Sequence, residues 1–338
     1  MSTSTTIATR ARKRVAAGVV GALALTGATL VASPQSGLIG RADAAAAQCS
    51  EDHSSTEFGG AAVSSAYGAY FNTSTPAASY LTDFVPQGLG LWQNWRGRSS
   101  TEDLFLVGMH HEDENSNRSL LYGMTPGGTV RGYARLPVGS HAGGVKVHNG
   151  WVYVQHDNGR ILRYSVSRIR QAFTDSTKRN LGWGAATNAV TDVSFFDIDG
   201  GYLYGGFHNP SARGHMYRYR ILADGNLVQD MAWGPIQIPT KAQGVLVLSN
   251  TWIFSTSRFR DYRGNVYVVR RGYGKGEEFT SVRYRCFQSV AMIQELVGYD
   301  GRTYLLNESG ASEFANGRIH NIRNLHVANT ETLRGLVW

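Results

Sequence analysis

The chain has 338 residues, of which 42% are hydrophobic and 17% are charged. This composition supports a folded core and excludes global disorder. The formal net charge is +8, but residues 1–47 contribute five basic residues and one acidic residue, so the remainder carries only +4. Its basic residues are scattered along predicted strands, which argues against nucleic acid as a partner.

Residues 1–47 have the layout of a secretory signal peptide. A basic start at positions 10–14 is followed by an uncharged run, 15–32, that is rich in Ala, Val and Leu, and small residues at 42–47 offer cleavage sites. An uncleaved membrane anchor is the alternative interpretation. We expect a secreted protein that has no membrane association once the signal is cleaved.

Two cysteines follow the signal. Cys49 lies in an N-terminal arm (48–83), and Cys286 lies 237 residues further along. Both would reach an oxidising compartment, where paired thiols form disulfides. The sequence therefore predicts a Cys49–Cys286 disulfide that ties the arm to the rest of the protein, and two free thiols are the alternative.

Beyond the arm, the chain repeats itself five times at a spacing of about 50 residues. Each repeat contains a run of large apolar residues that is typical of a strand, at 103–107, 150–154, 201–205, 251–255 and 301–305. A short apolar segment, often rich in glycine, precedes each run, at 86–90, 141–145, 192–196, 242–246 and 293–297. A further strand follows, at 118–122, 160–164, 215–219, 265–269 and 318–322, and a fainter one ends the repeat, as at 130–134 and 282–286.

Four strands in about 50 residues are the content of one propeller blade. The repeats predict an all-β chain whose residues 84–338 form a single β-propeller of five four-stranded blades. The arm would add a strand that closes the ring or build a partial sixth blade. A two-sheet sandwich is the structural alternative, but it does not explain a constant period. Only residues 165–173 have helical character.

Several short motifs support a resemblance to a known group of proteins. They are PQGL at 86–89, SHAGG at 140–144, QGV at 243–245, QEL at 294–296 and LLNE at 305–308. In these motifs the chain resembles, over residues 84–325, the secreted and functionally obscure propeller-like proteins of high-GC bacteria. The resemblance implies the fold and export, and it assigns no catalytic residue.

The strand order predicts where a site would lie. If the strands of a blade run outward, the first strand begins and the second ends at the same mouth of the central channel, where loops of all blades converge. We expect the ligand-binding residues there to be Gln87, His110, His141, His156, Asp192, His208, Gln243 and Glu295. The same face would carry His111, Asp157, Arg258, Gln294, Asn307 and Glu308.

Two kinds of reaction chemistry are compatible with this face. His141, His156, Asp192 and Glu295 could hold a divalent ion such as Ca²⁺ or Zn²⁺, although no fixed motif spacing supports such a cofactor. Alternatively, Asp192 and Glu295, or Asp83, could form a hydrolytic carboxylate pair, which needs two carboxyl groups about 5–10 Å apart. The catalytic candidates are therefore Asp192, Glu295 and His141.

The third possibility is binding without reaction. Trp92 and Trp95, in the loop after the first inner strand, are then the expected exposed platforms for stacking a sugar. We expect a secreted monomer that binds an extracellular carbohydrate, cell-wall component or other small molecule at the channel mouth. The alternative is an extracellular hydrolase at the same mouth, of a metal-assisted lactonase or esterase type or of a glycosidase type.

Overall fold

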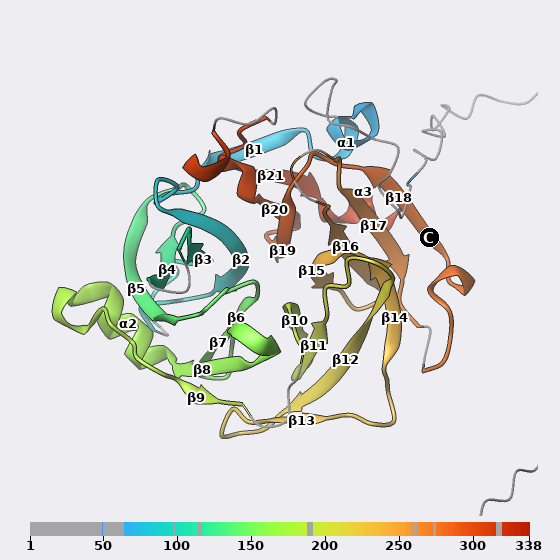
Figure 1. Ribbon diagram of the computed structural model, residues 1–338. Helices are drawn as coiled ribbons and strands as arrows, with labels where there is room; N and C mark the ends of the chain where they lie inside the picture. The colour runs from blue at the N-terminus through green and yellow to red at the C-terminus, as the bar shows by residue number, and fades with distance from the viewer. Residues whose placement is uncertain are drawn as a thin grey trace, which may run out of the picture. The chain divides into compact units, whose positions relative to one another are not determined.

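Each of the five repeats forms an antiparallel sheet, and the five sheets surround a central axis as the blades of a β-propeller (Figure 1). The computed structural model describes Cys49 and residues 64–338, apart from 98, 114–116, 188–191, 259, 261, 273–274 and 316–319. The predicted five-bladed all-β fold is confirmed. The predicted signal peptide lies outside the described residues. Among the described helices, none is long and apolar enough to cross a membrane.

The strands of the first four blades follow one another from the axis outward. Blade 1 contains β2 (Phe84–Trp92), β3 (Leu104–His111), β4 (Arg118–Met124) and β5 (Val130–Val138). Blade 2 contains β6 (Val145–His148), β7 (Trp151–Gln155), β8 (Ile161–Ser165) and β9 (Ala185–Ala186). Blade 3 contains β10 (Phe195–Asp199), β11 (Tyr202–Gly206), β12 (Arg213–Ile221), β13 (Leu227–Gln229) and β14 (Ile236–Thr240), and both β13 and β14 pair with β12. Blade 4 contains β15 (Ala242–Val247), β16 (Thr251–Thr256), β17 (Asn265–Arg270) and β18 (Tyr284–Gln288).

Blade 5 joins the two ends of the folded chain. It contains β19 (Ile293–Tyr299), β20 (Arg302–Asn307), β21 (Asn324–Asn329) and, as its outermost strand, β1 (Thr73–Ala77). β1 pairs antiparallel with β21, with Thr73 opposite Val327. Of the two roles considered for the arm, the structure therefore shows ring closure and not a partial sixth blade.

Two further contacts fasten the arm. Helix α1 (Ser65–Tyr70) precedes β1, and the ring of Tyr70 lies 4.9 Å from that of Phe287 in β18. The predicted disulfide between Cys49 and Cys286 is present and also ends on β18. In a chain-entropy description, cross-linking a loop of 237 residues stabilises the fold by about 5 kcal/mol. Blade 4 thus anchors the segment that closes blade 5.

The expected boundaries differ from the structure in three places. The inner strands of blades 2 and 3 begin at 145 and 195, later than the predicted 141 and 192, because Ala142 and Asp192 have left-handed φ values of 57° and 58° that interrupt an extended strand. The third strand of the last repeat lies at 324–329 and not at 318–322. Two short 3₁₀ helices, η4 (Glu308–Gly310) and η5 (Ser312–Phe314), lengthen that connection.

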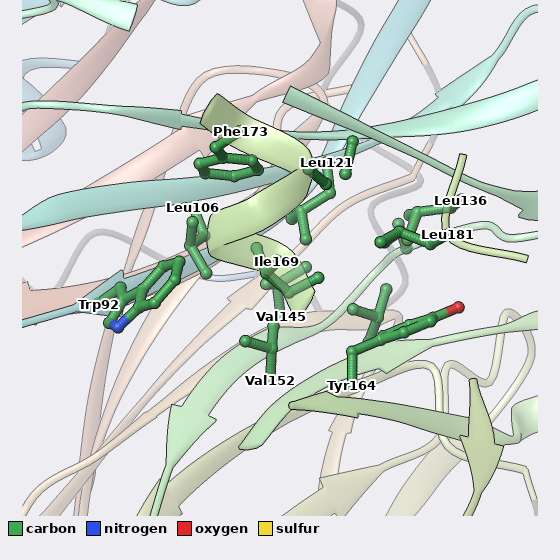
Figure 2. Close-up of a cluster of buried hydrophobic side chains, with 14 of the residues drawn as sticks. Trp92, Leu106, Leu121, Leu136, Val145, Val152, Tyr164, Ile169, Phe173 and Leu181 are labelled. Atoms are coloured by element: carbon green, nitrogen blue, oxygen red, sulfur yellow. The ribbon is translucent and has the colours of Figure 1, made fainter. Parts of the chain in front are cut away.

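Glycine in the inner strands allows the blades to crowd together, as the sequence predicts. A Cβ atom on Gly244 would lie 2.7 Å from the Cα of Glu295 in the next blade, and one on Gly90 would collide with the carbonyl oxygen of Val145. Farther out, apolar side chains fill the space between blades. Helix α2 (Val166–Thr174) adds Ile169 and Phe173 to the cluster between blades 1 and 2 (Figure 2).

A lysine lies buried on the propeller axis. Lys146 of β6 donates from Nζ to the carbonyl oxygens of Leu89, at 2.9 Å, and Leu296, at 3.1 Å. Its Nζ also lies 3.4 Å from Oδ1 of Asp197 and 3.8 Å from Oε1 of Glu295. The lysine therefore connects the inner strands of blades 1, 2, 3 and 5.

We call Lys146, Asp197 and Glu295 the axial network. Its two carboxylates also reach the remaining blade, blade 4. The amide of Val247 donates to Asp197 at 2.7 Å, and the amide of Val245 donates to Glu295 at 3.2 Å. Burial raises the pKa of Glu295 to about 8, although Lys146 opposes this shift. Glu295 therefore holds its proton for most of the time at neutral pH. Together, the side chains of Lys146, Asp197 and Glu295 tie all five inner strands to one another.

We predict that Lys146→Met lowers the free energy of unfolding by about 3–5 kcal/mol, because it leaves Asp197 buried without its cation. Urea denaturation followed by tryptophan fluorescence measures this. The matched control is Lys178→Met, which changes an exposed lysine and should shift stability by no more than about 0.5 kcal/mol. Equal stabilities of the two variants would contradict a structural role for the axial network.

Candidate functional site

A cavity of about 790 Å³ opens at the mouth where the inner strands begin, and we call it the mouth pocket. All five blades contribute to its wall. The residues that the sequence placed on this face and that line the pocket are Gln87, His110, His141, His208, Gln243, Arg258, Gln294 and Glu308. The repeat pattern thus brings together residues that lie up to 221 positions apart.

Three glutamines reach the mouth pocket from irregularities in strand pairing. The β2–β3 ladder passes over Gln87 between Pro86 and Gly88, and the β15–β16 ladder passes over Gln243. The β19–β20 ladder passes over both Gln294 and Glu295, between Ile293 and Leu296. A bulged residue leaves the normal alternation of the strand, which can re-aim its side chain. The bulges explain how three blades direct an amide toward one cavity.

The chain enters four of the five inner strands through a non-glycine residue with left-handed backbone. These residues are Ala142, Asp192, Lys241 and Met292, with φ between 57° and 61° and a spacing of about 50 residues. Such backbone costs of order 1 kcal/mol or more at each position and is held only where surrounding contacts determine it. The entry to these four inner strands is therefore a repeated turn.

Glu308 is the most constrained carboxyl group of the mouth pocket. It follows β20, and its Oε2 accepts a hydrogen bond of 2.5 Å from Nε2 of Gln87. Burial raises the pKa of Glu308 to about 7, while the hydrogen bonds from Gln87 and Gln294 and the charge of His141 lower it. The same side chain can therefore hold or release a proton near neutral pH.

The three histidines of the pocket have different roles. The rings of His110 and His141 stack with centroids 4.8 Å apart. Nδ1 of His208 lies 3.2 Å from the carbonyl oxygen of Ala242, so it donates to that oxygen and leaves Nε2 as an acceptor. Burial lowers the pKa of His208, and nearby Lys241 lowers it further, so this ring is neutral at neutral pH.

Sequence reasoning missed several lining residues, among them Gln155, Lys241, Ser257, Arg260 and Glu313. Lys241 lies directly before the fourth inner strand, one residue outside the segment from which the site residues of that blade were predicted. Arg260 and Glu313 lie in the loops after the second strands of blades 4 and 5, beyond the strand ends from which the face was predicted.

The predicted metal ligands do not meet. His141 lines the mouth pocket, but Glu295 belongs to the axial network and Asp192 lines a separate small cavity of about 120 Å³. His156 is 3% exposed and packs against Trp183, with ring centroids 4.7 Å apart. In the described ranges, no three His, Cys, Asp or Glu side chains are grouped so that they could hold a metal ion.

The expectation that Trp92 and Trp95 are exposed is wrong. They are 4% and 2% exposed, and both pack against Phe173 of helix α2, which lies over this region (Figure 2). Nε1 of Trp95 donates to Glu102 at 2.7 Å. The carboxylate pair predicted from Asp192 and Glu295 does not form either, because the two residues lie in different places, and Asp83 does not line the mouth pocket. The carboxyl groups that line the mouth pocket are those of Glu308 and Glu313.

We predict that Glu308→Gln changes how stability depends on pH. The folded protein holds the Glu308 proton more tightly than the unfolded chain, so this residue's contribution to stability falls as pH rises from about 4.5 to about 7. The variant should therefore gain about 1–3 kcal/mol relative to the wild type between pH 4.5 and pH 8. Thermal and urea denaturation at both pH values measure this.

The control for this experiment is Glu331→Gln, which changes an exposed glutamate of helix α3 (Thr330–Arg334). Its stability should follow the wild type at both pH values. If Glu308→Gln also follows the wild type, the raised pKa of Glu308 is wrong.

Comparison with known proteins finds chains of similar fold but no match among family models or curated proteins. No family model matches the chain, and no curated protein matches it. Glutaminyl cyclase from Myxococcus xanthus is 11% identical, with a TM-score of 0.48 over 75% of this chain and 93% of that one. BamB from Moraxella catarrhalis is 10% identical, with a TM-score of 0.34 over 72% and 82% of the two chains. Sqt1 from Saccharomyces cerevisiae is 13% identical, with a TM-score of 0.33 over 70% and 60%. At these identities the likeness concerns the fold alone.

Proposed function

We propose that this protein is a secreted β-propeller that binds a small polar ligand of the carbohydrate class in the mouth pocket. The observation that carries the proposal is the convergence of Gln87, Gln243 and Gln294 from bulges in three blades. Gln243 offers one acceptor and two donor hydrogens, which suits neighbouring hydroxyl groups of a sugar. Gln87 and Gln294 each donate one hydrogen bond to Glu308 and keep their remaining amide atoms for a ligand. The predicted signal peptide and the disulfide support an extracellular location.

The dimensions and wall of the mouth pocket also support this function. Its volume of about 790 Å³ lies in the range of small-molecule sites. Apolar contact comes from Pro210, Met292 and Phe314, and most other lining side chains are polar. A ligand that is rich in hydroxyl groups would satisfy such a wall, whereas an apolar ligand would leave many polar groups without partners.

We predict that Gln243→Ala weakens ligand binding about 5- to 10-fold, as expected for the loss of one neutral hydrogen bond, with an unchanged melting temperature. A glycan array identifies bound saccharides, and isothermal titration calorimetry measures the affinities. The control is Gln171→Ala on the exposed side of α2. Absence of binding to any saccharide, or equal affinities of both variants, would overturn the proposal.

A second candidate function is hydrolysis at the same pocket. The observation that favours it is Glu308, whose pKa of about 7 suits a general acid, with Glu313 close enough to raise that pKa further. A glycosidase mechanism requires such a protonated carboxyl and a second carboxylate. Such a mechanism uses the two carboxyl groups alone and does not require a bound metal ion.

We predict for this candidate that Glu308→Gln reduces turnover of a bound glycoside at least 100-fold while its affinity stays within a few-fold of the wild type. Product release from nitrophenyl glycosides, esters and lactones measures turnover. Binding without turnover of any of these substrates would leave the ligand-binding function and exclude hydrolysis of these three classes.

A further inference from the structure

An exposed tryptophan lies at the same end of the propeller as the mouth pocket. Trp183 belongs to the connection between α2 and β9, and it is 62% exposed, the largest fraction among the aromatic side chains of the described residues. Its ring lies against His156, which follows β7, and near Arg160, which precedes β8. Because second strands end and third strands begin at the mouth, both contacts place the indole there. We call Trp183 the outer platform.

The outer platform is held in one orientation although most of it is exposed. The buried ring of His156 lies 4.7 Å from the indole, with 33° between the two planes, and the guanidinium of Arg160 lies 5.8 Å from the indole centroid. Burial lowers the pKa of His156, so an uncharged ring packs against the tryptophan at neutral pH. The hydroxyl of Tyr164 donates to the carbonyl oxygen of Gly182 at 3.1 Å and so fixes the preceding residue. An aromatic ring that is ordered beforehand loses little entropy when a ligand stacks on it.

Two segments of the chain connect the wall of the mouth pocket to the support of the outer platform. Gln155 lines the pocket, and His156 is the next residue. His141 also lines the pocket, and a Cβ atom on Gly139, two residues earlier, would lie 3.6 Å from Cε1 of His156. A single residue, His156, therefore separates the pocket wall from the indole. A chain-like ligand that leaves the pocket over blade 2 would meet Trp183 with its outer units.

Isolated apolar side chains are common on protein surfaces, so exposure alone would say little about Trp183. Its fixed orientation and its place beside the pocket distinguish it. An indole face can stack on the apolar face of a sugar ring, and the exposed guanidinium of Arg160 can donate to the hydroxyl groups at the edge of that ring. We propose that the ligand is an oligosaccharide whose inner units occupy the mouth pocket and whose outer units stack on Trp183. This inference rests on the proposed function and adds the length and the direction of the ligand.

The test compares two lengths of the same sugar chain, using the disaccharides and hexasaccharides of cellulose, chitin and galactan. Isothermal titration calorimetry should show a hexasaccharide that binds at least about 10-fold tighter than its disaccharide, as expected for one added aromatic contact. Trp183→Ala should weaken binding of that hexasaccharide about 10-fold. The same variant should change the affinity for the disaccharide no more than about two-fold, because the disaccharide stays within the pocket and does not reach the indole.

Two further variants separate stacking from a general effect on the protein. Trp183→Tyr keeps an aromatic face and should bind the hexasaccharide within about three-fold of the wild type. The matched control is Trp338→Ala. Trp338 is 52% exposed and has the guanidinium of Arg270 4.3 Å from its ring centroid, but it bonds to Thr251, where β16 begins at the opposite end of the propeller. This variant should leave both affinities unchanged.

The outcomes distinguish the outer platform from the proposed function. Equal affinities for the two lengths, or a gain with length that survives Trp183→Ala, would overturn the role of the outer platform and leave the proposed function in place. Binding confined to monosaccharides and disaccharides on the glycan array would do the same. Absence of binding to every saccharide on the array would overturn both.

Discussion

The fold depends on a charged interaction placed where five strands meet. Inner strands that crowd around an axis leave room for few side chains, and Lys146 fills this space with a cation that must be paired because it is out of water. Its carbonyl acceptors and the carboxylates of Asp197 and Glu295 come from different blades. Any shift of one blade along the axis would break several of these contacts, so the network fixes the relative height of all five inner strands.

That fixed height matters for the mouth pocket. Gln294 and Glu295 are adjacent on β19, yet Gln294 lines the pocket and Glu295 joins the axial network. The strand that carries Gln294 into the pocket is therefore also held by the hydrogen bonds of Glu295. Lys146 and Asp197 also line a cavity at the opposite end of the channel, so the network lies between two separate openings.

The sequence predicted the number of blades and the period because both follow from the spacing of the repeats. It predicted the disulfide because the chain has two cysteines and an export signal, and the face of the pocket because strand order places the strand ends there. It could not assign individual roles within the repeat. Glu295 and Gln294 look alike in a strand pattern, and only the bulge decides which one reaches the mouth. Trp92 and Trp95 looked like exposed loop residues because the pattern did not show that α2 would cover them. The strand pattern made no prediction for Lys146, whose burial depends on acceptors from three other blades.

The pairing of β1 with β21 has a consequence for how the protein is made. Strand β1, the first described strand, finds its partner about 250 residues later in β21, the last described strand. Blades 1 to 4 are each built from contiguous chain and can form in order of synthesis, but the ring stays open until residue 329 has emerged. A product truncated before β21 therefore keeps the exposed strand edges that quality-control proteases and chaperones recognise.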